Sequence, residues 1–170
     1  ASHPGQPELL ARLALIAKQR GALGEAESLL RRAIGGAPGD AALHNNLGNV
    51  LRVAGRFTAA EACYRKAIAL NPAYPEAHYN LGVVLEDQAR PDEALAAYRD
   101  GVALRPDDSA ARTRIGAILH AQARLLEALA ELDAATAIDP QSFEAHYFRG
   151  LVLAAMERFD EGAAALSRAA

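Results

Sequence analysis

The chain has 170 residues, of which 51% are hydrophobic and 5% aromatic, and its formal net charge is −3 at pH 7. This weak negative charge argues against nucleic acid as a partner, because nucleic-acid-binding proteins gather lysine and arginine on one face. No apolar run approaches the roughly 18 residues that a membrane-spanning helix needs. Alanine and leucine are abundant and β-branched residues are few, so the composition favours packed helices over a sheet.

The single cysteine, Cys63, forms no intrachain disulfide, so cysteine usage does not indicate an oxidising compartment. Residues 1–7 lack the basic and then apolar pattern of a secretory leader. We therefore expect a cytoplasmic protein, with the bacterial periplasm as the alternative.

Prolines recur at a constant interval along the chain. Four of them are 34 residues apart, with no insertion between them: Pro38, Pro72, Pro106 and Pro140. A fixed period of this length is typical of a repeat architecture. It predicts a flexible lead-in at 1–6 and one repeat domain at 7–170, divided into repeats 7–40, 41–74, 75–108, 109–142 and an incomplete fifth repeat at 143–170.

When each repeat is numbered from its first residue, equivalent positions carry equivalent residues. Position 7 is aliphatic in the first four repeats: Leu13, Leu47, Leu81 and Ile115. Position 8 is small throughout: Ala14, Gly48, Gly82, Gly116 and Gly150. Position 20 is also small: Ala26, Ala60, Ala94, Ala128 and Gly162. Position 24 is large: Leu30, Tyr64, Tyr98, Leu132 and Leu166. Small residues at fixed positions predict places where two helices approach closely.

Each repeat is predicted to form two helices separated by a short turn. In the second repeat Leu43, Leu47 and Leu51 recur at helical spacing and form an apolar stripe. The turn is predicted near position 15, which holds Gly21, Gly55, Ala89, Ala123 and Glu157. Pro91 suits the first turn of a second helix, where its missing N–H costs nothing. The prolines at position 32 are predicted to follow helix ends.

One such hairpin buries too little apolar area to offset its chain entropy, so the hairpins must stack. With four full repeats in register, the chain from Pro7 onward resembles the tetratricopeptide repeat family. The resemblance implies an all-α solenoid of antiparallel helix pairs, wound as a right-handed superhelix. It also implies that the first helix of each pair lines a concave groove.

Three residues depart from the pattern. Gly101 and Gly162 stand where other repeats carry alanine, and each is expected to weaken its helix by roughly 0.5–1 kcal/mol. Arg149 occupies position 7, where an aliphatic residue is expected. The last repeat ends without a polar capping helix, so we expect the natural chain to continue beyond Ala170.

Three histidines share position 4: His44, His78 and His146. Whole hairpins separate them, which favours packing between helices over a metal site. His3 and His120 are predicted to be exposed, and Cys63 to be an inert packed thiol. Phosphate loops, nucleophile elbows and paired carboxylates in a strand–turn context are absent from the sequence, so we expect no enzymatic activity, no cofactor and no metal.

The resemblance implies that positions 2, 5, 6, 9, 12 and 13 of each first helix face the groove. The predicted peptide-binding residues at these positions are Asn45, Asn46, Asn49, Arg52, Tyr79, Asn80 and Arg114. An asparagine amide both donates and accepts hydrogen bonds, so it can bind the backbone of an extended peptide of any sequence. The alternative is an ordinary solvated helix face.

Asn46 and Asn80 are similar to the asparagine column with which O-GlcNAc transferases, members of this family, hold peptide backbone. The column is interrupted here at its other three places, by Arg12, Arg114 and Phe148. The resemblance therefore implies backbone binding over the second and third repeats and puts an extended ladder in doubt.

The family members that bind chaperone tails use a carboxylate clamp of five residues. Asn49, Asn80 and Arg114 match three of its positions. Asn45 and Ala110 stand where the clamp needs lysines, which removes most of the charge-assisted hydrogen bonding to a terminal carboxylate. We therefore do not expect a working clamp.

The sequence thus predicts a protein-interaction scaffold that binds an extended peptide or a helix of another protein in the groove. Two alternatives stay open. The chain could be the substrate-recruiting portion of a larger enzyme, such as a glycosyltransferase or other transferase, whose catalytic domain lies outside these residues. It could also self-associate through the uncapped C-terminal repeat.

Overall fold

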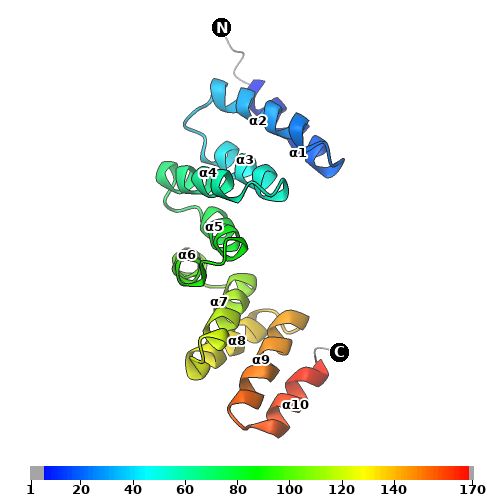
Figure 1. The fold of residues 1–170 in the computed structure, drawn as a ribbon, viewed down its shortest axis with the longest axis vertical. Coiled ribbons are helices and arrows are strands. Elements are labelled where there is room, and N and C mark those ends of the chain that lie inside the picture. The colour runs from blue at the N-terminus through cyan, green and yellow to red at the C-terminus, as the bar shows by residue number, and fades with distance from the viewer. Residues whose placement is uncertain (1–5, 169–170) are drawn as a thin grey trace. The chain divides into compact units, whose positions relative to one another are not determined.

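The computed structural model describes residues 6–168, which form ten α-helices and contain no strand. In chain order these are α1 (Gln6–Gln19), α2 (Leu23–Gly36), α3 (Ala41–Val53), α4 (Phe57–Leu70), α5 (Pro75–Asp87), α6 (Pro91–Leu104), α7 (Ser109–Ala121), α8 (Leu125–Ile138), α9 (Phe143–Ala155) and α10 (Phe159–Arg168) (Figure 1). Each predicted repeat contributes two helices, so the prediction of an all-α solenoid built from repeated helix pairs is confirmed. Helix α1 begins at Gln6, and the rest of the predicted lead-in, with His3, lies outside the described residues.

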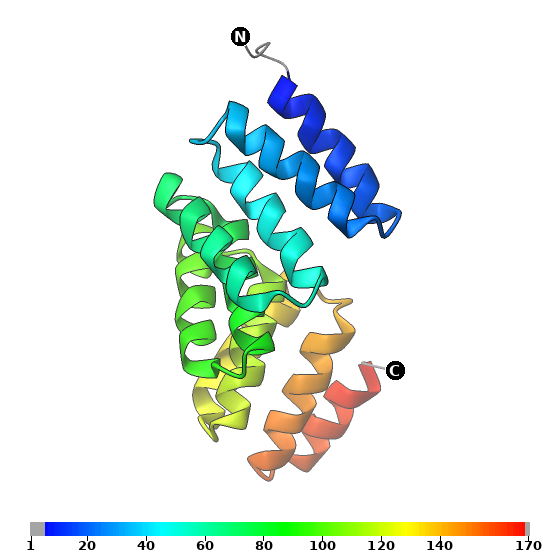
Figure 2. The ribbon, with the colours of Figure 1, turned by 45° about the horizontal axis from the view of Figure 1, so that its top comes forward.

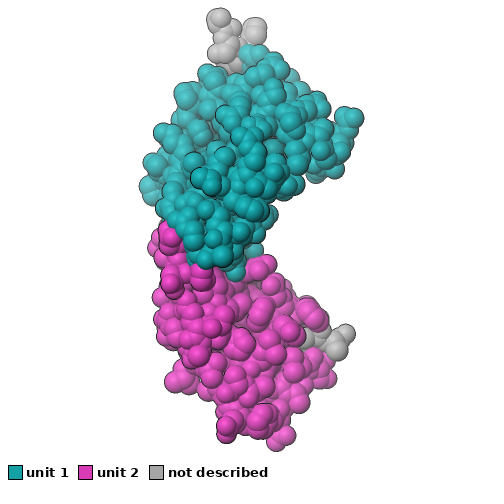
Figure 3. Space-filling model, in the orientation of Figure 1, with its two compact units in different colours: residues 1–90 teal, residues 91–170 magenta. Residues whose placement is uncertain are grey.

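The chain divides into two compact units, residues 1–90 and 91–170, coloured separately in Figure 3. The N-terminal unit contains α1 to α5, and the C-terminal unit contains α6 to α10. Within the first, the hairpins α1–α2 and α3–α4 pack side by side (Figure 2), and α5 packs on α4. Within the second, α6 packs on α7, and the hairpins α7–α8 and α9–α10 follow. Each unit is therefore a stack of neighbouring helices.

Local sequence sets where the helices begin. The first helices of three repeats have side-chain caps: Asp40 and Asp108 accept from the backbone N–H of Ala42 and Ala111 at 2.9 Å, and Ser142 Oγ accepts from Ala145 at 3.3 Å. Such caps satisfy N–H groups that lack a partner in the first turn. Helices α5 and α6 instead begin with prolines, which need no such partner. The predicted start of α6 at Pro91 is confirmed.

All five turns between paired helices contain a residue with positive φ at position 15. The values are 77° at Gly21, 72° at Gly55, 56° at Ala89, 57° at Ala123 and 61° at Glu157. In every case the following N–H reaches the carbonyl five residues earlier at 2.9 Å, which closes the helix end. The predicted breaks are confirmed, and three non-glycine residues adopt the left-handed conformation there at a cost in free energy.

The small residues at position 8 lie against the large residue at position 24 of the same hairpin. A Cβ added to Gly48 would lie 2.6 Å from Tyr64 Cε1, and one added to Gly116 would lie 2.5 Å from Leu132 Cγ. Real Cβ atoms do not approach so closely, so glycine permits the contact. Tyr64 and Leu132 are fully buried as a result. The predicted close approach is confirmed at both places.

Gly162 has a packing reason for its departure from alanine. A Cβ there would lie 3.2 Å from the carbonyl oxygen of Gly150 and 3.3 Å from the backbone nitrogen of Ala154. Both contacts are with the backbone of α9, which cannot move away as a flexible side chain can. The helix-weakening glycine therefore allows α10 to approach α9.

Arg149 is explained by a matching change in α8. Its Nε donates a hydrogen bond to Asp133 Oδ1 at 2.5 Å. Asp133 is at position 25, where the first three repeats carry arginine: Arg31, Arg65 and Arg99. The fourth repeat thus supplies a carboxylate where the fifth supplies a cation, and the pair replaces an aliphatic contact.

Candidate functional site

A cavity of about 250 Å³ lies between α1 and α3 in the N-terminal unit. Its walls include apolar Leu15 and Val50, and its polar groups come from Arg12, Lys18 and the two asparagines Asn46 and Asn49. Concave sites of this kind, apolar with a few polar groups, are where proteins bind ligands. We call this cavity the α1–α3 groove.

Two predicted residues supply amides to the α1–α3 groove. Asn46 is exposed, and the structure gives it no hydrogen bond to any described residue. Asn49 is half-buried, and its Oδ1 accepts from the Tyr64 hydroxyl at 2.8 Å. Burial raises the pKa of Tyr64 to about 12, so its hydroxyl keeps the proton that it donates. This bond fixes the orientation of Asn49 and leaves its NH₂ group able to donate to a ligand.

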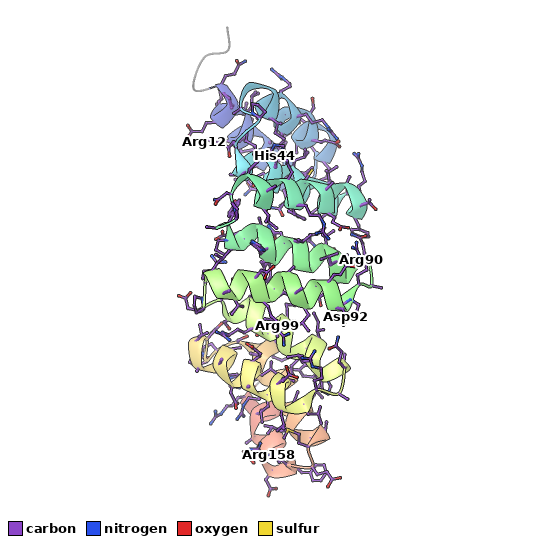
Figure 4. The ribbon with its side chains drawn as sticks, turned by 90° about the vertical axis from the view of Figure 1, so that its left-hand side faces the viewer. Arg12, His44, Arg90, Asp92, Arg99 and Arg158 are labelled. Carbon is purple, nitrogen blue, oxygen red and sulfur yellow. The ribbon has the colours of Figure 1, made fainter. Side chains whose placement is uncertain are left out.

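The two basic side chains that line the groove differ in whether they form an ion pair. Arg12, labelled in Figure 4, pairs with Glu8 one turn earlier at 2.7 Å, and both side chains are largely exposed. An ion pair this exposed to solvent contributes little to the free energy of folding. Lys18 lines the groove but forms no ion pair with the described residues. The groove therefore contains one cation whose charge is not neutralised by a neighbour.

Asn45 and Asn80 are both predicted to bind a peptide, but in the structure their side-chain amides bond to each other. The side chain of Asn45 is buried, with only 4% of the residue exposed. Its Oδ1 accepts from Asn80 Nδ2 at 2.9 Å, and its Nδ2 donates to the Tyr74 hydroxyl at 3.4 Å. The two asparagines thus link α3 to α5. Asn45 offers no surface to a ligand, and Asn80 is half-buried with its amide already engaged.

The remaining predicted residues also lie outside the α1–α3 groove. Arg52 of α3 pairs with Asp87 of α5 at 3.3 Å, while its buried Nε has no partner. Tyr79 is half-buried on α5. Arg114 belongs to the C-terminal unit, where it lies 3.6 Å from Glu144. The structure therefore brings only Asn46 and Asn49 of the predicted set together at one described cavity.

The histidines at position 4 hold the preceding proline segment. In three repeats Nε2 lies within hydrogen-bond distance of a proline carbonyl: His44 and Pro38 at 3.0 Å, His78 and Pro72 at 3.1 Å, and His146 and Pro140 at 3.1 Å. A carbonyl oxygen only accepts, so Nε2 must donate and has no lone pair for a metal. Arg112, at the same position of the fourth repeat, donates to Pro106 in the same way at 2.9 Å.

The other potential metal ligands and nucleophiles among the described residues do not form a reactive site. Across residues 6–168, no three His, Cys, Asp or Glu side chains are placed to hold a metal ion. Burial raises the pKa of the Cys63 thiol, which disfavours the nucleophilic thiolate. His120 is half-buried rather than exposed as predicted. None of the described helices is long and apolar enough to cross a membrane.

Comparison with known proteins identifies the repeats. A tetratricopeptide repeat family model matches residues 45–109 and 85–143, which together span more than half of the chain. The chain belongs to the tetratricopeptide repeat family. The comparison with curated proteins found no match.

Solved tetratricopeptide repeat (TPR) structures resemble the chain over most of its length. YrrB, described as a TPR protein with an unusual peptide-binding site, is 26% identical, with a TM-score of 0.77 over 94% of this chain and 82% of YrrB. MamA from Desulfovibrio magneticus RS-1 is 20% identical, with a TM-score of 0.86 over 99% and 95% of the two chains. PilF of Pseudomonas aeruginosa is 19% identical, with a TM-score of 0.86 over 97% and 77%. The last two show the fold alone.

Sequence reasoning missed the contribution of the first TPR repeat. Six residues of α1 line the α1–α3 groove, and five of them are at positions 2, 5, 6, 9 and 12: Glu8, Ala11, Arg12, Leu15 and Lys18. These are positions that the family resemblance assigns to the groove. The signal was therefore available in the sequence, but the predicted peptide-binding residues all lie in the second, third and fourth repeats.

Proposed function

We propose that this TPR protein is an interaction module that binds an extended segment of a partner protein in the α1–α3 groove. The proposal rests on a group of hydrogen-bond donors at that groove that bond to no other described residue. Asn46 and the NH₂ group of Asn49 can donate to backbone carbonyls, and Lys18 supplies a charge. That YrrB is described as having a peptide-binding site supports the same reading.

The chemistry of the groove defines the segment that fits it. Amides bind backbone without regard to side chains, so Asn46 and Asn49 favour an extended chain. Lys18 favours an acidic side chain or carboxylate, because opposite charges gain most where neither is already paired. Leu15, which is exposed at the wall of the groove, favours an apolar side chain beside it. The expected ligand is therefore an extended peptide with an acidic residue next to an apolar one.

A displayed library of random peptides, selected against the chain, tests this specificity. We expect the selected peptides to be enriched in acidic residues. Their affinities are then measured by fluorescence anisotropy for the wild type and for Asn46→Ala, Lys18→Gln and Lys66→Gln. Lys66 is exposed on α4, away from the groove, and serves as the charge-matched control.

Asn46→Ala should weaken binding about 2- to 12-fold, which is the scale of one hydrogen bond. Lys18→Gln should weaken binding at low salt and have less effect at high salt, because salt screens exposed charges. Lys66→Gln should leave binding unchanged. Selected peptides that bind all three variants with wild-type affinity would place the binding site elsewhere.

A further inference from the structure

A second cavity, of about 520 Å³, lies in the C-terminal unit and is lined by residues of α8, α9 and α10. Its lining includes Asp133 and Thr136 of α8, Arg149 of α9 and Arg168 of α10. These four side chains are polar or charged, and two of them are arginines. The volume is within the range of sites that bind small ligands or single side chains. We call this cavity the α8–α10 hollow.

The N-terminal unit has a smaller hollow, of about 320 Å³, at the equivalent place among α2, α3 and α4. At positions 28, 7 and 26 it is lined by Ile34, Leu47 and Lys66. At the same positions the α8–α10 hollow has Thr136, Arg149 and Arg168. Further helices follow the first hollow, so a hollow at this place is a feature of the repeat. Only the α8–α10 hollow has polar residues where the other has two aliphatic ones.

Arg149 keeps unused donors after its ion pair with Asp133. Its Nε donates to Asp133 Oδ1 at 2.5 Å, and the structure records no hydrogen bond from its two terminal nitrogens to any described residue. A guanidinium has five N–H donors in a rigid fork, so Arg149 can bind a second oxyanion without releasing Asp133. The Asp133 carboxylate therefore orients the guanidinium but does not use all of its donors.

The charges that line the hollow select the class of ligand. Arg149 and Arg168 are positive and Asp133 is negative, which leaves one net positive charge. A single carboxylate neutralises that charge, whereas a doubly charged phosphate would be repelled more strongly by Asp133. Arginine also binds a carboxylate through two parallel N–H···O bonds. The charge balance therefore favours a carboxylate.

We propose that the α8–α10 hollow is a second binding site, at which Arg149 and Arg168 bind a carboxylate group. It lies in the C-terminal unit, whereas the α1–α3 groove lies in the N-terminal unit. The proposal goes beyond the binding of an extended segment in that groove and does not depend on it. The carboxylate belongs either to an acidic side chain of a protein or to a small carboxylic acid, because both present the same group to the arginines.

Nuclear magnetic resonance of the isotope-labelled chain tests the proposal, because the Nε–H group of Arg149 gives its own signal. The probes are sodium acetate, glutamate blocked at its backbone amine and carboxyl groups, and inorganic phosphate, all at constant ionic strength. We expect acetate and blocked glutamate to shift the Arg149 signal saturably, and blocked glutamine to leave it unchanged. Tighter binding of blocked glutamate than of acetate would indicate an acidic side chain as the source, and the reverse order a small carboxylic acid.

Variants at the hollow separate binding from folding. Arg149→Leu introduces the residue that Leu47 and Leu81 supply at this position, so it should keep the wild-type circular dichroism spectrum. It should weaken acetate binding, followed through the Arg168 signal, roughly tenfold or more, the scale of losing a hydrogen bond to a charged group. Asp133→Asn keeps an acceptor for Arg149 Nε and removes the opposing charge, so it should strengthen binding about 2- to 5-fold.

Arg99→Leu is the charge-matched control, because Arg99 is exposed on α6 and does not line the hollow. This variant should bind acetate as the wild type does. The proposal would be overturned by shifts that grow without saturation, by phosphate binding more tightly than both carboxylates, or by wild-type affinity in Arg149→Leu.

Discussion

At the residue scale, the left-handed residues show where local strain is tolerated. Position 15 has positive φ in all five turns, yet only Gly21 and Gly55 are glycines. Ala89, Ala123 and Glu157 adopt the same conformation with a side chain, which costs about 1–2 kcal/mol each. The hydrogen bond from the next residue to the helix end holds them there. The later turns are therefore less favourable than the first two.

Replacing Ala123 by glycine should relieve this strain. We expect Ala123→Gly to raise the free energy of unfolding by about 0.5–1 kcal/mol, since the relieved strain exceeds the entropy cost of glycine. Ala130→Gly, at an exposed position inside α8, should instead lower it by about 0.5–1 kcal/mol. Urea denaturation of both variants measures the difference. Equal destabilisation would mean that the turn at Ala123 carries no strain.

At the element scale, acidic residues at position 21 tie one repeat to the next. Glu27 of α2 pairs with Arg56 at 2.8 Å, and Glu61 of α4 pairs with Arg90 at 2.7 Å. Arg90, labelled in Figure 4, ends the N-terminal unit. Gln88 donates to the same Glu61 carboxylate at 2.9 Å. Each bridge spans a contact between adjacent hairpins rather than a contact within one.

The Glu61 bridge predicts a pH dependence of stability. Burial raises the pKa of Glu61, but hydrogen bonds from Gln88 and Arg90 outweigh burial and lower the pKa below its ordinary value of 4.5. A lowered pKa means that the folded state favours the carboxylate, so this stability is present above 4.5 and is lost on acidification. The thermal midpoint of the wild type should therefore fall more steeply between about pH 5 and 3 than that of Glu61→Gln. Identical slopes for the wild type and Glu61→Gln would show that Glu61 does not contribute to the pH dependence of stability.

At the scale of the whole molecule, the helices of residues 6–168 that pack on one another within each unit belong to the same or adjacent repeats. Stability in such a chain depends on each repeat and its nearest neighbours. Damage to one hairpin should therefore spread to its neighbours first.

Leu132→Ala tests how far destabilisation spreads. Leu132 is fully buried in α8 against Gly116, so the change should cost about 2–5 kcal/mol in the C-terminal unit. Hydrogen exchange should show lost protection in α7 to α9, with α1 to α3 retaining most of theirs. Equal loss of protection along the chain would indicate a single cooperative unit.

The sequence by itself determined the helix pairs and their close contacts. A period of 34 residues, with small residues at positions 8 and 20 and breaks at position 15, predicts the paired helices because these features depend on nearby residues. The choice of Asn46 and Asn49 came from the resemblance to the tetratricopeptide repeat family, which implies which positions of each first helix face the groove. Only the tertiary structure decided the rest. Burial of Asn45 between α3 and α5, engagement of Asn80, and the pairing of Arg149 with Asp133 depend on how helices from different repeats meet. Helical spacing gives the direction of a side chain, but what covers it is set by a neighbour about 16 to 35 residues away in the sequence.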